Sequence, residues 1–567
     1  MKTLSPIRPY HHAPTAAYWA AGAFIVLAPM MLLIFLQLVP PSVWDFVSND
    51  WRDLSFTGGA RLLEQSWLPP EGSGGWLTSP GGYLSLLWPF LVQPRFGLPV
   101  TLHLFVALAI AATLASEIFG LVRDQGSRAI LAEHISGPQP FWGNAAKVHL
   151  AKYWKDDLRR TGRGVELAPD LIIPRQRETE GFLLAGRPGS GKSVILEGLM
   201  AQALTRGARV VALDVKGRLA ERLKGFEPNV LGLSSKDRVV WNIGRDLVDE
   251  ADADEFAACL IPESRDPVWS EGSRLVLSAI VQSLQGRHDK DWGWIQLNQC
   301  LSLPVEKLEP IIFDYAPSIA ELLGAREDPP SFVVSLVFNL ASHVSATASR
   351  FADMEKKGSE RLSLRDWAKS TDRRQKPLIM QYDFQRRDRS AALMRLTLRV
   401  LSGALLGAET PDGIDSDTWI FLDELTRIGP SKSVEDLASL GRSRGVRTVV
   451  TVQSPAQLVD VYGAAGAEAL RENFATQIVC AMPQGDNAQR VSRDWIGDRI
   501  VEEPDYQVKA DQKPQTWTLP ALSREEIAGE LGLKYDLWGR PLIRAAVVTD
   551  GNVAVLDWPL SRWKRLR

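Results

Sequence analysis

The chain has 567 residues, and its 65 Lys and Arg nearly balance its 67 Asp and Glu, for a formal net charge of −2. Hydrophobic residues make up 45% and charged residues 23%, as in globular proteins, and three Cys are too few for a disulfide scaffold. This composition excludes a disordered chain, a collagen-like fibre and a protein that binds nucleic acid through bulk positive charge. The length predicts about three or four domains.

Two apolar segments near the N-terminus predict membrane-spanning helices. Residues 16–39 carry no charged side chain, and residues 98–122 carry only Glu117. Both are long enough to cross a hydrocarbon core about 30 Å thick. A cleaved signal peptide is the alternative for the first segment, but its apolar run is longer than that of a signal peptide. We therefore expect two spans joined by a loop over 41–97.

The distribution of Lys and Arg predicts the orientation of these spans, because such residues concentrate in cytoplasmic loops. The tail 1–15 and the segment 123–165 after the second span are both net positive, whereas the loop 41–97 has only three Arg. Both termini are therefore expected in the cytoplasm, and the loop outside, in the periplasm of a Gram-negative host. All Cys would then be cytoplasmic, and without C-x-x-C spacing they are interpreted as structural thiols: Cys259, Cys300 and Cys480.

A phosphate-binding loop follows a short apolar strand at 182–185. The next eight residues read G-x-x-x-x-G-K-S, and an amphipathic pattern continues to Leu204. Glycines let backbone N–H groups turn toward phosphates, and the helix N-terminus adds partial positive charge. Lys192 is expected to contact the β- and γ-phosphates, and Ser193 to bind Mg²⁺. The motif predicts a nucleotide site formed by Gly186, Arg187, Pro188, Gly189, Ser190, Gly191, Lys192 and Ser193.

A second apolar strand, 418–422, ends in a pair of carboxylates. Acidic residues are common at strand ends, but together with a phosphate-binding loop they indicate nucleotide hydrolysis. We expect Asp423 to complete the Mg²⁺ site and Glu424 to act as the general base that polarises the attacking water.

Further apolar strands are expected at 209–213, 378–382, 448–452 and 478–482, separated by helical stretches. This alternation predicts a doubly wound, mainly parallel α/β sheet with its ligands at the carboxyl ends of the strands. Asp214 and Gln453 follow two of these strands. For Gln453, contact with the γ-phosphate or water and a structural role both stay open.

The strand pattern lapses between 241 and 375, where helical patterns dominate. We expect an inserted all-α domain there, flanked by the two parts of a nucleotide-binding domain, 166–240 and 376–567. The acidic run 246–255 is interpreted as a solvated helix start. The segment 123–165 is expected to be a cytoplasmic connection to the membrane anchor, 16–122.

Several further motifs, in this order and spacing, resemble the type IV secretion coupling proteins of bacterial conjugation. D-x-K-G is matched at 214–217, W-N at 241–242 and D-P-x-W at 266–269. G-R-x-x-G-V follows at 441–446, before the strand that ends in Gln453. None of these is specific alone, but their order and spacing together are.

This resemblance implies a RecA-like P-loop NTPase that uses ATP and Mg²⁺ and works as a homo-hexameric ring in the bacterial inner membrane. It implies a motor that moves DNA, independently of sequence, from a relaxase to a type IV secretion channel. It also implies a catalytic role for Gln453, and an arginine finger at Arg442 that completes a neighbour's site, with Arg444 as the second choice. A surface salt bridge is the alternative for Arg442.

Positive side chains that contact DNA phosphates are expected in the motor domain. The candidates are Arg386, Arg387, Arg389 and Arg447. Alternative functions are a double-stranded DNA translocase of the FtsK/HerA type and a coupling ATPase that recruits protein effectors. An ABC transporter ATPase and a non-enzymatic scaffold fit less well, because the first needs a signature motif that is missing and the second needs no hydrolytic residues.

Overall fold

The computed structural model describes residues 4–6, 21–31, 42–45, 50–53, 105–117, 131–234, 239–324, 331–370, 372, 375–407, 416–502 and 514–560. The chain divides into two compact units, 1–134 with 501–517, and 135–500 with 518–567. The second unit carries the phosphate-binding loop.

The first unit contains two short apolar helices, Ala21–Met31 and Phe105–Glu117. They lie inside the two segments predicted to span the membrane, and the remaining parts of those segments are outside the described residues. This unit also contains short strands. β1 (Leu4–Pro6) pairs with β4 (Leu131–Ser136) in a four-stranded sheet with β17 (Asp498–Glu502) and β18 (Thr516–Pro520), and β2 (Ser42–Asp45) pairs with β3 (Asp50–Asp53).

Among the described residues, only one helix is long and apolar enough to cross a membrane, α16 (Ser331–Lys356). Its side chains Leu340, Val344 and Phe351 are buried in the core of the second unit. We therefore interpret α16 as a core helix.

The second unit is built on an 11-stranded sheet with the order β10-β13-β9-β14-β15-β8-β16-β20-β21-β5, in which β19 also pairs with β20. The parallel strands are β10 (Asn229–Gly232), β13 (Leu378–Gln381), β9 (Arg209–Asp214), β14 (Thr418–Leu422), β15 (Val446–Val452), β8 (Phe182–Ala185) and β16 (Thr476–Val479). Antiparallel pairs then follow, with β5 parallel at the edge: β19 (Gly532–Tyr535), β20 (Pro541–Thr549), β21 (Asn552–Pro559) and β5 (Pro140–Trp142). The predicted mainly parallel sheet is confirmed.

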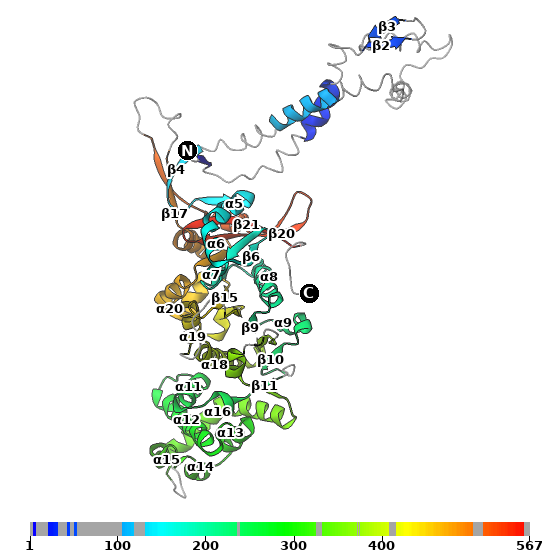
Figure 1. Cartoon of the computed structure of the whole chain (residues 1–567). Coiled ribbons are helices and arrows are strands. Elements are labelled where there is room, and N and C mark those ends of the chain that lie inside the picture. The colour runs from blue at the N-terminus through cyan, green and yellow to red at the C-terminus, as the bar shows by residue number, and fades with distance from the viewer. Residues whose placement is uncertain are drawn as a thin grey trace, which may run out of the picture. The chain divides into compact units, whose positions relative to one another are not determined.

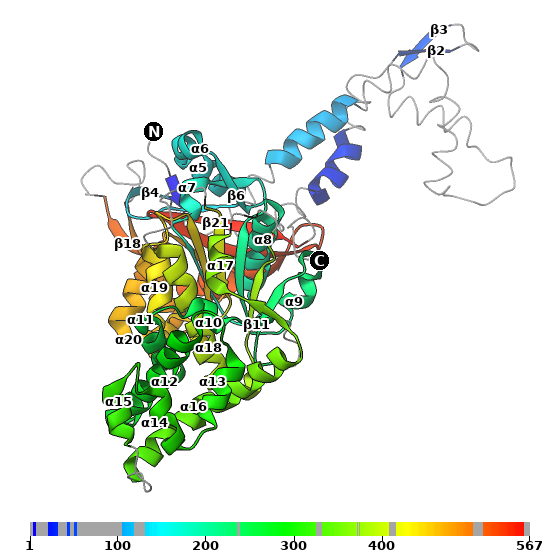
Figure 2. The same ribbon diagram turned by 60° about the horizontal axis from the view of Figure 1, so that its bottom comes forward.

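Both faces of this sheet are buried, as its apolar strands require. Along β8, Phe182 and Leu184 point into one hydrophobic core, and Leu183 and Ala185 into the other. Figure 2 shows α8 (Lys192–Thr205) on one side of the sheet and α19 (Lys432–Ser439) and α20 (Pro455–Glu472) on the other. The sheet is therefore doubly wound, as predicted.

Residues 140–161, expected in the connection to the membrane anchor, add elements to this sheet unit. Besides β5 they form α5 (Gly143–Tyr153) and α6 (Lys155–Thr161), and the buried side chains Leu150 and Trp154 join the same core as Phe182. The hairpin β6 (Arg163–Ala168) and β7 (Leu171–Pro174) and the short α7 (Arg175–Glu178) lead into β8.

Between β11 (Val239–Trp241) and β12 (Glu360–Leu362) the elements of the described residues are all helices, joined by short connections. These two strands pair in parallel, so the beginning and the end of this stretch lie side by side. The helices form a separate group in Figure 1, made of α11 (Glu250–Leu260), α12 (Pro267–His288), α13 (Trp294–Leu301), α14 (Val305–Ile312), α15 (Pro317–Leu323) and α16.

Aromatic side chains fill the core of this helical group. The ring centroids of Trp241 and Trp294 are 6.0 Å apart, and those of Trp294 and Phe351 are 4.7 Å apart. The indole of Trp241 donates a hydrogen bond to the buried carboxylate of Asp246, 2.6 Å away. That carboxylate also accepts from Leu364 N–H at 2.7 Å, at the start of α17 (Leu364–Lys369). The prediction of a solvated acidic run is therefore wrong for Asp246.

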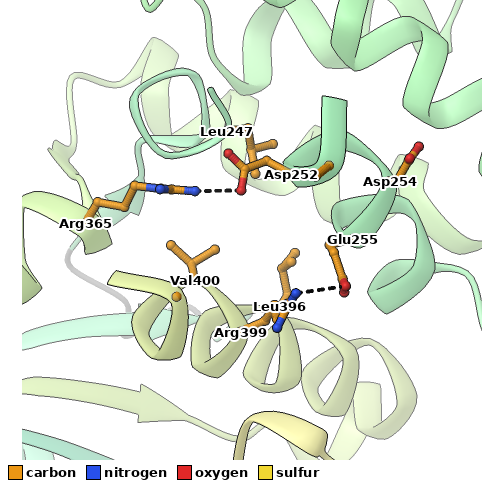
Figure 3. A pocket seen from close by; sticks show the side chains of 10 residues that line it. Leu247, Asp252, Asp254, Glu255, Arg365, Leu396, Arg399 and Val400 are labelled. Atoms are coloured by element: carbon orange, nitrogen blue, oxygen red, sulfur yellow. Dashed lines mark hydrogen bonds and ion pairs between the residues drawn. The ribbon is translucent and has the colours of Figure 1, made fainter. Parts of the chain in front are cut away.

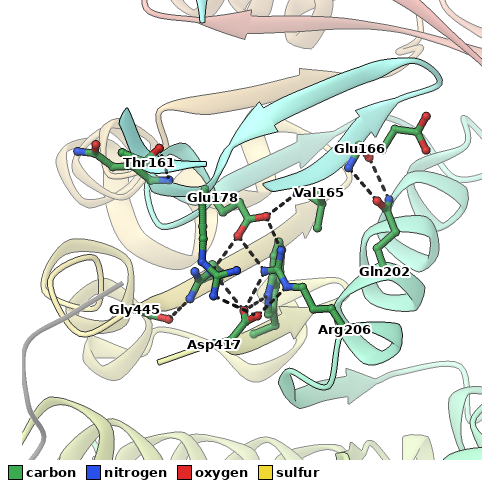
Figure 4. Close-up of polar contacts among 12 residues, drawn as sticks. Thr161, Val165, Glu166, Glu178, Gln202, Arg206, Asp417 and Gly445 are labelled. Atoms are coloured by element: carbon green, nitrogen blue, oxygen red, sulfur yellow. Dashed lines mark hydrogen bonds and ion pairs between the residues drawn. The ribbon is translucent and has the colours of Figure 1, made fainter. Parts of the chain in front are cut away.

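The amino ends of the central strands are held by a buried network of ion pairs. Arg206 binds the carboxylates of Glu178, at 2.8 Å, and Asp417, at 2.6 Å (Figure 4). Arg447, fully buried, contacts Glu178 at 3.1 Å. Burial alone would raise the pKa of Asp417, but Arg206 and Arg447 hold it below its usual value. The prediction that Arg447 contacts DNA is therefore wrong, because its charge is buried and paired.

Replacing Arg447 with leucine is expected to destabilise the protein by about 3 kcal/mol, since it leaves buried carboxylates without one partner. Urea unfolding of the purified chain would measure this. The control is Arg159→Leu, since the Arg159 side chain is 70% exposed and its pair with Asp156 is worth at most about 1 kcal/mol. Equal stability of the two variants would contradict the role of the network.

Candidate functional site

The phosphate-binding loop connects the buried strand β8 to α8 and is fastened to both neighbouring strands. Gly186 N–H donates to Val452 O on β15 at 3.3 Å, and Arg187 N–H donates to Ala481 O just after β16 at 2.9 Å. Gly191 has a φ of 104°, and a Cβ there would lie 2.4 Å from Ile543 of β20. Only glycine fits this conformation and this contact without strain.

Within the loop, Ser190 and Lys192 are buried, whereas Arg187, Pro188 and Gly189 are exposed. The Lys192 ammonium donates to the carbonyls of Gly186 and Arg187, the latter at 3.2 Å. Burial lowers the pKa of Lys192. The lysine thus curls over the loop that it is predicted to complete, with its charge next to the backbone groups that would surround phosphates.

Burial also raises the pKa of Cys480, which packs against this loop. A Cβ on Gly186 would be 2.7 Å from the Cys480 Cβ, so the loop packs directly on it. Desolvation raises the pKa of the Cys480 thiol to about 12 and that of Cys259 to about 11. Such protonated thiols suit the structural role expected for the cysteines.

The predicted acidic pair follows β14, as expected. The hydroxyl of Thr451 on β15 donates to Asp423 Oδ1 at 2.8 Å and accepts from Glu424 N–H at 2.9 Å. Glu424 has a φ of 56°, a left-handed conformation that costs a residue other than glycine on the order of 1–3 kcal/mol. Arg427 lies 3.3 Å from the Glu424 carboxylate. One hydroxyl therefore fixes both acidic residues.

The strand β15 lies between β8 and β14, so it connects the loop to the acidic pair. Gln453 directly follows β15 and is half-buried. Gln457 Nε2 on α20 lies 3.5 Å from Gln453 Oε1. Gln453 therefore lies at the same edge of the sheet as the phosphate-binding loop, Asp423 and Glu424.

The two predicted Mg²⁺ ligands face a common space. The ammonium of Lys216 lies 3.0 Å from Ser193 Oγ and 3.4 Å from Asp423 Oδ2. A hydroxyl and a carboxylate are hard oxygen ligands of the kind that bind Mg²⁺ together with nucleotide phosphates. These residues fit the metal expected from the sequence.

Arg442 is not part of this group in its own chain. It lies in the turn before β15, and its guanidinium contacts Glu180, just before β8, at 2.6 Å. Both residues are at the amino ends of the strands, opposite to the phosphate-binding loop. The Arg442 side chain is 51% exposed.

Three contacts of the site were not predicted from the sequence, those of Thr451, Lys216 and Arg427. Thr451 could have been found from the sequence, because it is a hydroxyl residue in the otherwise apolar last part of its strand. Lys216 belongs to the D-x-K-G motif, which by itself predicts no contact for it. Arg427 has no pattern that distinguishes it from a surface arginine.

A cavity of about 350 Å³ lies away from this site, between α11 and α18 (Arg387–Leu406). Figure 3 shows that two ion pairs cross it, Asp252 with Arg365 and Glu255 with Arg399. These pairs join α11 of the helical group to α17 and α18. One helical turn before Arg399, Arg395 donates to Ile428 O at 2.6 Å, at the end of the turn that follows Glu424.

Comparison with known proteins gives consistent matches. The family described as the type IV secretion-system coupling protein DNA-binding domain matches residues 166–519. Coupling protein TraD of Escherichia coli strain K12 is 24% identical over 333 residues, which cover 58% of this chain and 45% of TraD. The chain thus matches less than half the length of that relative.

Solved structures share the fold. Bacterial conjugative coupling protein TrwBdeltaN70, in its unbound monoclinic form, is 20% identical, with a TM-score of 0.61 over 78% of this chain and 96% of its own. Plasmid coupling protein TrwB in complex with ADP and Mg²⁺ is 19% identical, with a TM-score of 0.59 over the same shares, 78% and 96%.

Proposed function

The chain belongs to the family of type IV secretion-system coupling proteins, and from this premise we propose that it is an ATP-driven DNA motor. In this proposal it accepts a relaxase–DNA complex and moves the DNA into a type IV secretion channel. One observation carries the proposal. The phosphate-binding loop, Asp423, Glu424 and Gln453 all lie at the same edge of the sheet.

The chemistry proposed for this edge is hydrolysis of the terminal phosphate of ATP. Loop N–H groups and Lys192 bind the phosphates, and Ser193 and Asp423 hold Mg²⁺, which when bound neutralises phosphate charge. Glu424 accepts the proton of the attacking water, with its backbone fixed by Thr451. Gln453 orients that water or the γ-phosphate. The relative TrwB has been solved with ADP and Mg²⁺ and with an ATP analogue, which supports these ligands.

A neighbouring subunit is proposed to supply Arg442, with Arg444 as the second choice, in a homo-hexameric ring. Because Arg442 lies at the amino ends of the strands, it is on the wrong side of the sheet for its own nucleotide. Its half-exposed guanidinium is accessible to a neighbour if the contact with Glu180 opens. An arginine supplied in trans stabilises the charge of the transition state.

Contacts to DNA are proposed at the start of α18. Arg386 and Arg387 are exposed there, and Arg389 is half-buried. Arg386 is paired with Asp383 at 2.6 Å, so it would exchange this partner for a phosphate. Such contacts bind DNA independently of its sequence.

The domain arrangement proposed for this function has a cytoplasmic motor, 166–240 with 376–567, to which residues 140–161 add β5, α5 and α6, and a helical insertion, 241–375. The parallel pair of β11 and β12 supports an insertion that leaves and re-enters the motor at one place.

We further propose that residues 16–39 and 98–122 span the bacterial inner membrane, with both termini in the cytoplasm. The basic segments on one side and the short apolar helices support this topology. A single cysteine placed in 41–97 should react with a membrane-impermeant thiol reagent applied to spheroplasts, whereas one placed in 1–15 should not. Equal labelling of both positions would contradict the topology.

Lys192→Ala should reduce ATP hydrolysis and conjugative DNA transfer by at least about 100-fold, because the charge at the phosphates is lost. Hydrolysis by the purified chain and transfer from cells measure this, and the amount of protein in the membrane fraction should not change. The matched control is Lys224→Ala, an exposed lysine outside the site. Normal turnover of Lys192→Ala would contradict the assigned site.

The same variant tests Arg442 when it is mixed with a second one. Subunits that carry Arg442→Ala keep their own phosphate-binding loop, and Lys192→Ala subunits keep Arg442. Mixed rings should therefore regain part of the hydrolysis that each variant lacks alone. Absence of any recovery would favour the salt bridge with Glu180 as the sole role of Arg442.

A further inference from the structure

The loop after β9 holds the backbone of Lys216 in a fixed place. Asp214 is only 3% exposed, and its carboxylate faces this loop. Its Oδ1 accepts hydrogen bonds from Lys216 N–H at 3.1 Å and Gly217 N–H at 2.8 Å, and its Oδ2 accepts from Leu219 N–H at 2.7 Å. A buried carboxylate with three such bonds is a strong anchor. Motion at Lys216 is therefore left to its side chain.

That side chain ends between two residues that the proposed function assigns to Mg²⁺. Its ammonium is 3.0 Å from Ser193 Oγ and 3.4 Å from Asp423 Oδ2, while the side chain as a whole is 49% exposed. An ion pair this exposed contributes little net stability, and holding a lysine in one rotamer offsets much of it. The contact is thus weak enough to open and close.

A cation that binds the same two oxygen atoms cannot share them with the ammonium. Mg²⁺ requires short, nearly octahedral contacts with its ligands, which leave no room for a lysine nitrogen between them. Without a cation, Asp423 and Glu424 would place negative charge beside the nucleotide phosphates. A positive charge at this place therefore favours nucleotide binding, whether Mg²⁺ or Lys216 supplies it.

We propose that Lys216 is a tethered cation that occupies the Mg²⁺ position and is displaced when Mg²⁺ binds with the nucleotide. This proposal rests on the proposed nucleotide site and makes Lys216 a positioning residue for it. In the absence of Mg²⁺, Lys216 neutralises Asp423 and so favours nucleotide binding. In its presence, Lys216 competes for Ser193 and Asp423, which raises the Mg²⁺ concentration that the site requires.

The test is the affinity of the purified full chain for fluorescent ADP, measured first in EDTA and then over a range of Mg²⁺ concentrations. In Lys216→Gln, the affinity for ADP without Mg²⁺ should fall about fivefold, as expected for the loss of one exposed charge pair. The Mg²⁺ concentration that gives half of the full increase in ADP affinity should also be about fivefold lower than in the wild type. Lys216→Arg keeps a positive charge, so its ADP affinity and its Mg²⁺ dependence should be closer to those of the wild type. Lys224→Gln, in the same β9–β10 connection, is the matched control and should not differ.

The outcomes separate this proposal from the one on which it rests. If the wild-type chain binds no ADP at any Mg²⁺ concentration, the nucleotide site itself fails, and the proposal for Lys216 fails with it. If the wild type binds and Lys216→Gln has the same Mg²⁺ dependence, only the tethered cation is overturned. An equal loss of affinity at every Mg²⁺ concentration would overturn it too, because Lys216 would then contact the nucleotide directly. Lys216→Met serves as a second variant if Lys216→Gln does not fold, as judged by its thermal unfolding.

Discussion

The hydroxyl of Thr451 connects the parts of the site that the sequence keeps far apart. It lies on β15, the strand between the phosphate-binding strand β8 and the acidic strand β14. It binds Asp423 and the backbone of Glu424, while the next residue, Val452, accepts the N–H of Gly186. One strand therefore sets the spacing between the groups that would bind phosphate and those that would activate water. Any shift of β15 would change both sides of the site together.

Ion pairs at the amino ends of the same strands hold β15 in the position from which it sets the spacing of the site. The buried pairs of Arg447 and Arg206 with Glu178 and Asp417 fasten β8, β14 and β15 at their amino ends. At the same edge, the half-exposed guanidinium of Arg442 pairs with the buried carboxylate of Glu180. The strands are thus held at their amino ends by buried ion pairs, and the exposed side of Arg442 is the part of this network that the proposed neighbouring subunit would use.

A connection from this site toward the helical insertion runs along α18. Arg395 contacts the turn after Glu424, and Arg399, one helical turn later, contacts Glu255 of α11 across the cavity. Both arginines lie on the same face of the helix. Helix α18 therefore contacts both the turn after Glu424 and the helical insertion.

The phosphate-binding loop and the acidic pair were predictable because each is a local motif that follows an apolar strand. The six strands predicted by range, which correspond to β8, β9, β13, β14, β15 and β16, lie within a few residues of their predicted positions, whereas β10 was not predicted. The contacts of Thr451 and Lys216 were not, because they depend on which strands are neighbours, and β15 lies between β8 and β14 although it follows both in sequence. The burial of Arg447 and Asp246 was missed for a related reason. A charged residue in a sequence gives no sign that a partner distant in the chain will be buried with it.

The central claim, that this site drives a DNA motor, is tested most directly by ATP hydrolysis of the full chain in lipid nanodiscs as DNA is added. The account predicts that DNA of unrelated sequences stimulates hydrolysis equally, and that the apparent affinity for DNA falls as salt rises, with a log–log slope set by the number of phosphate contacts. Hydrolysis that responds to no DNA at any salt concentration would contradict it.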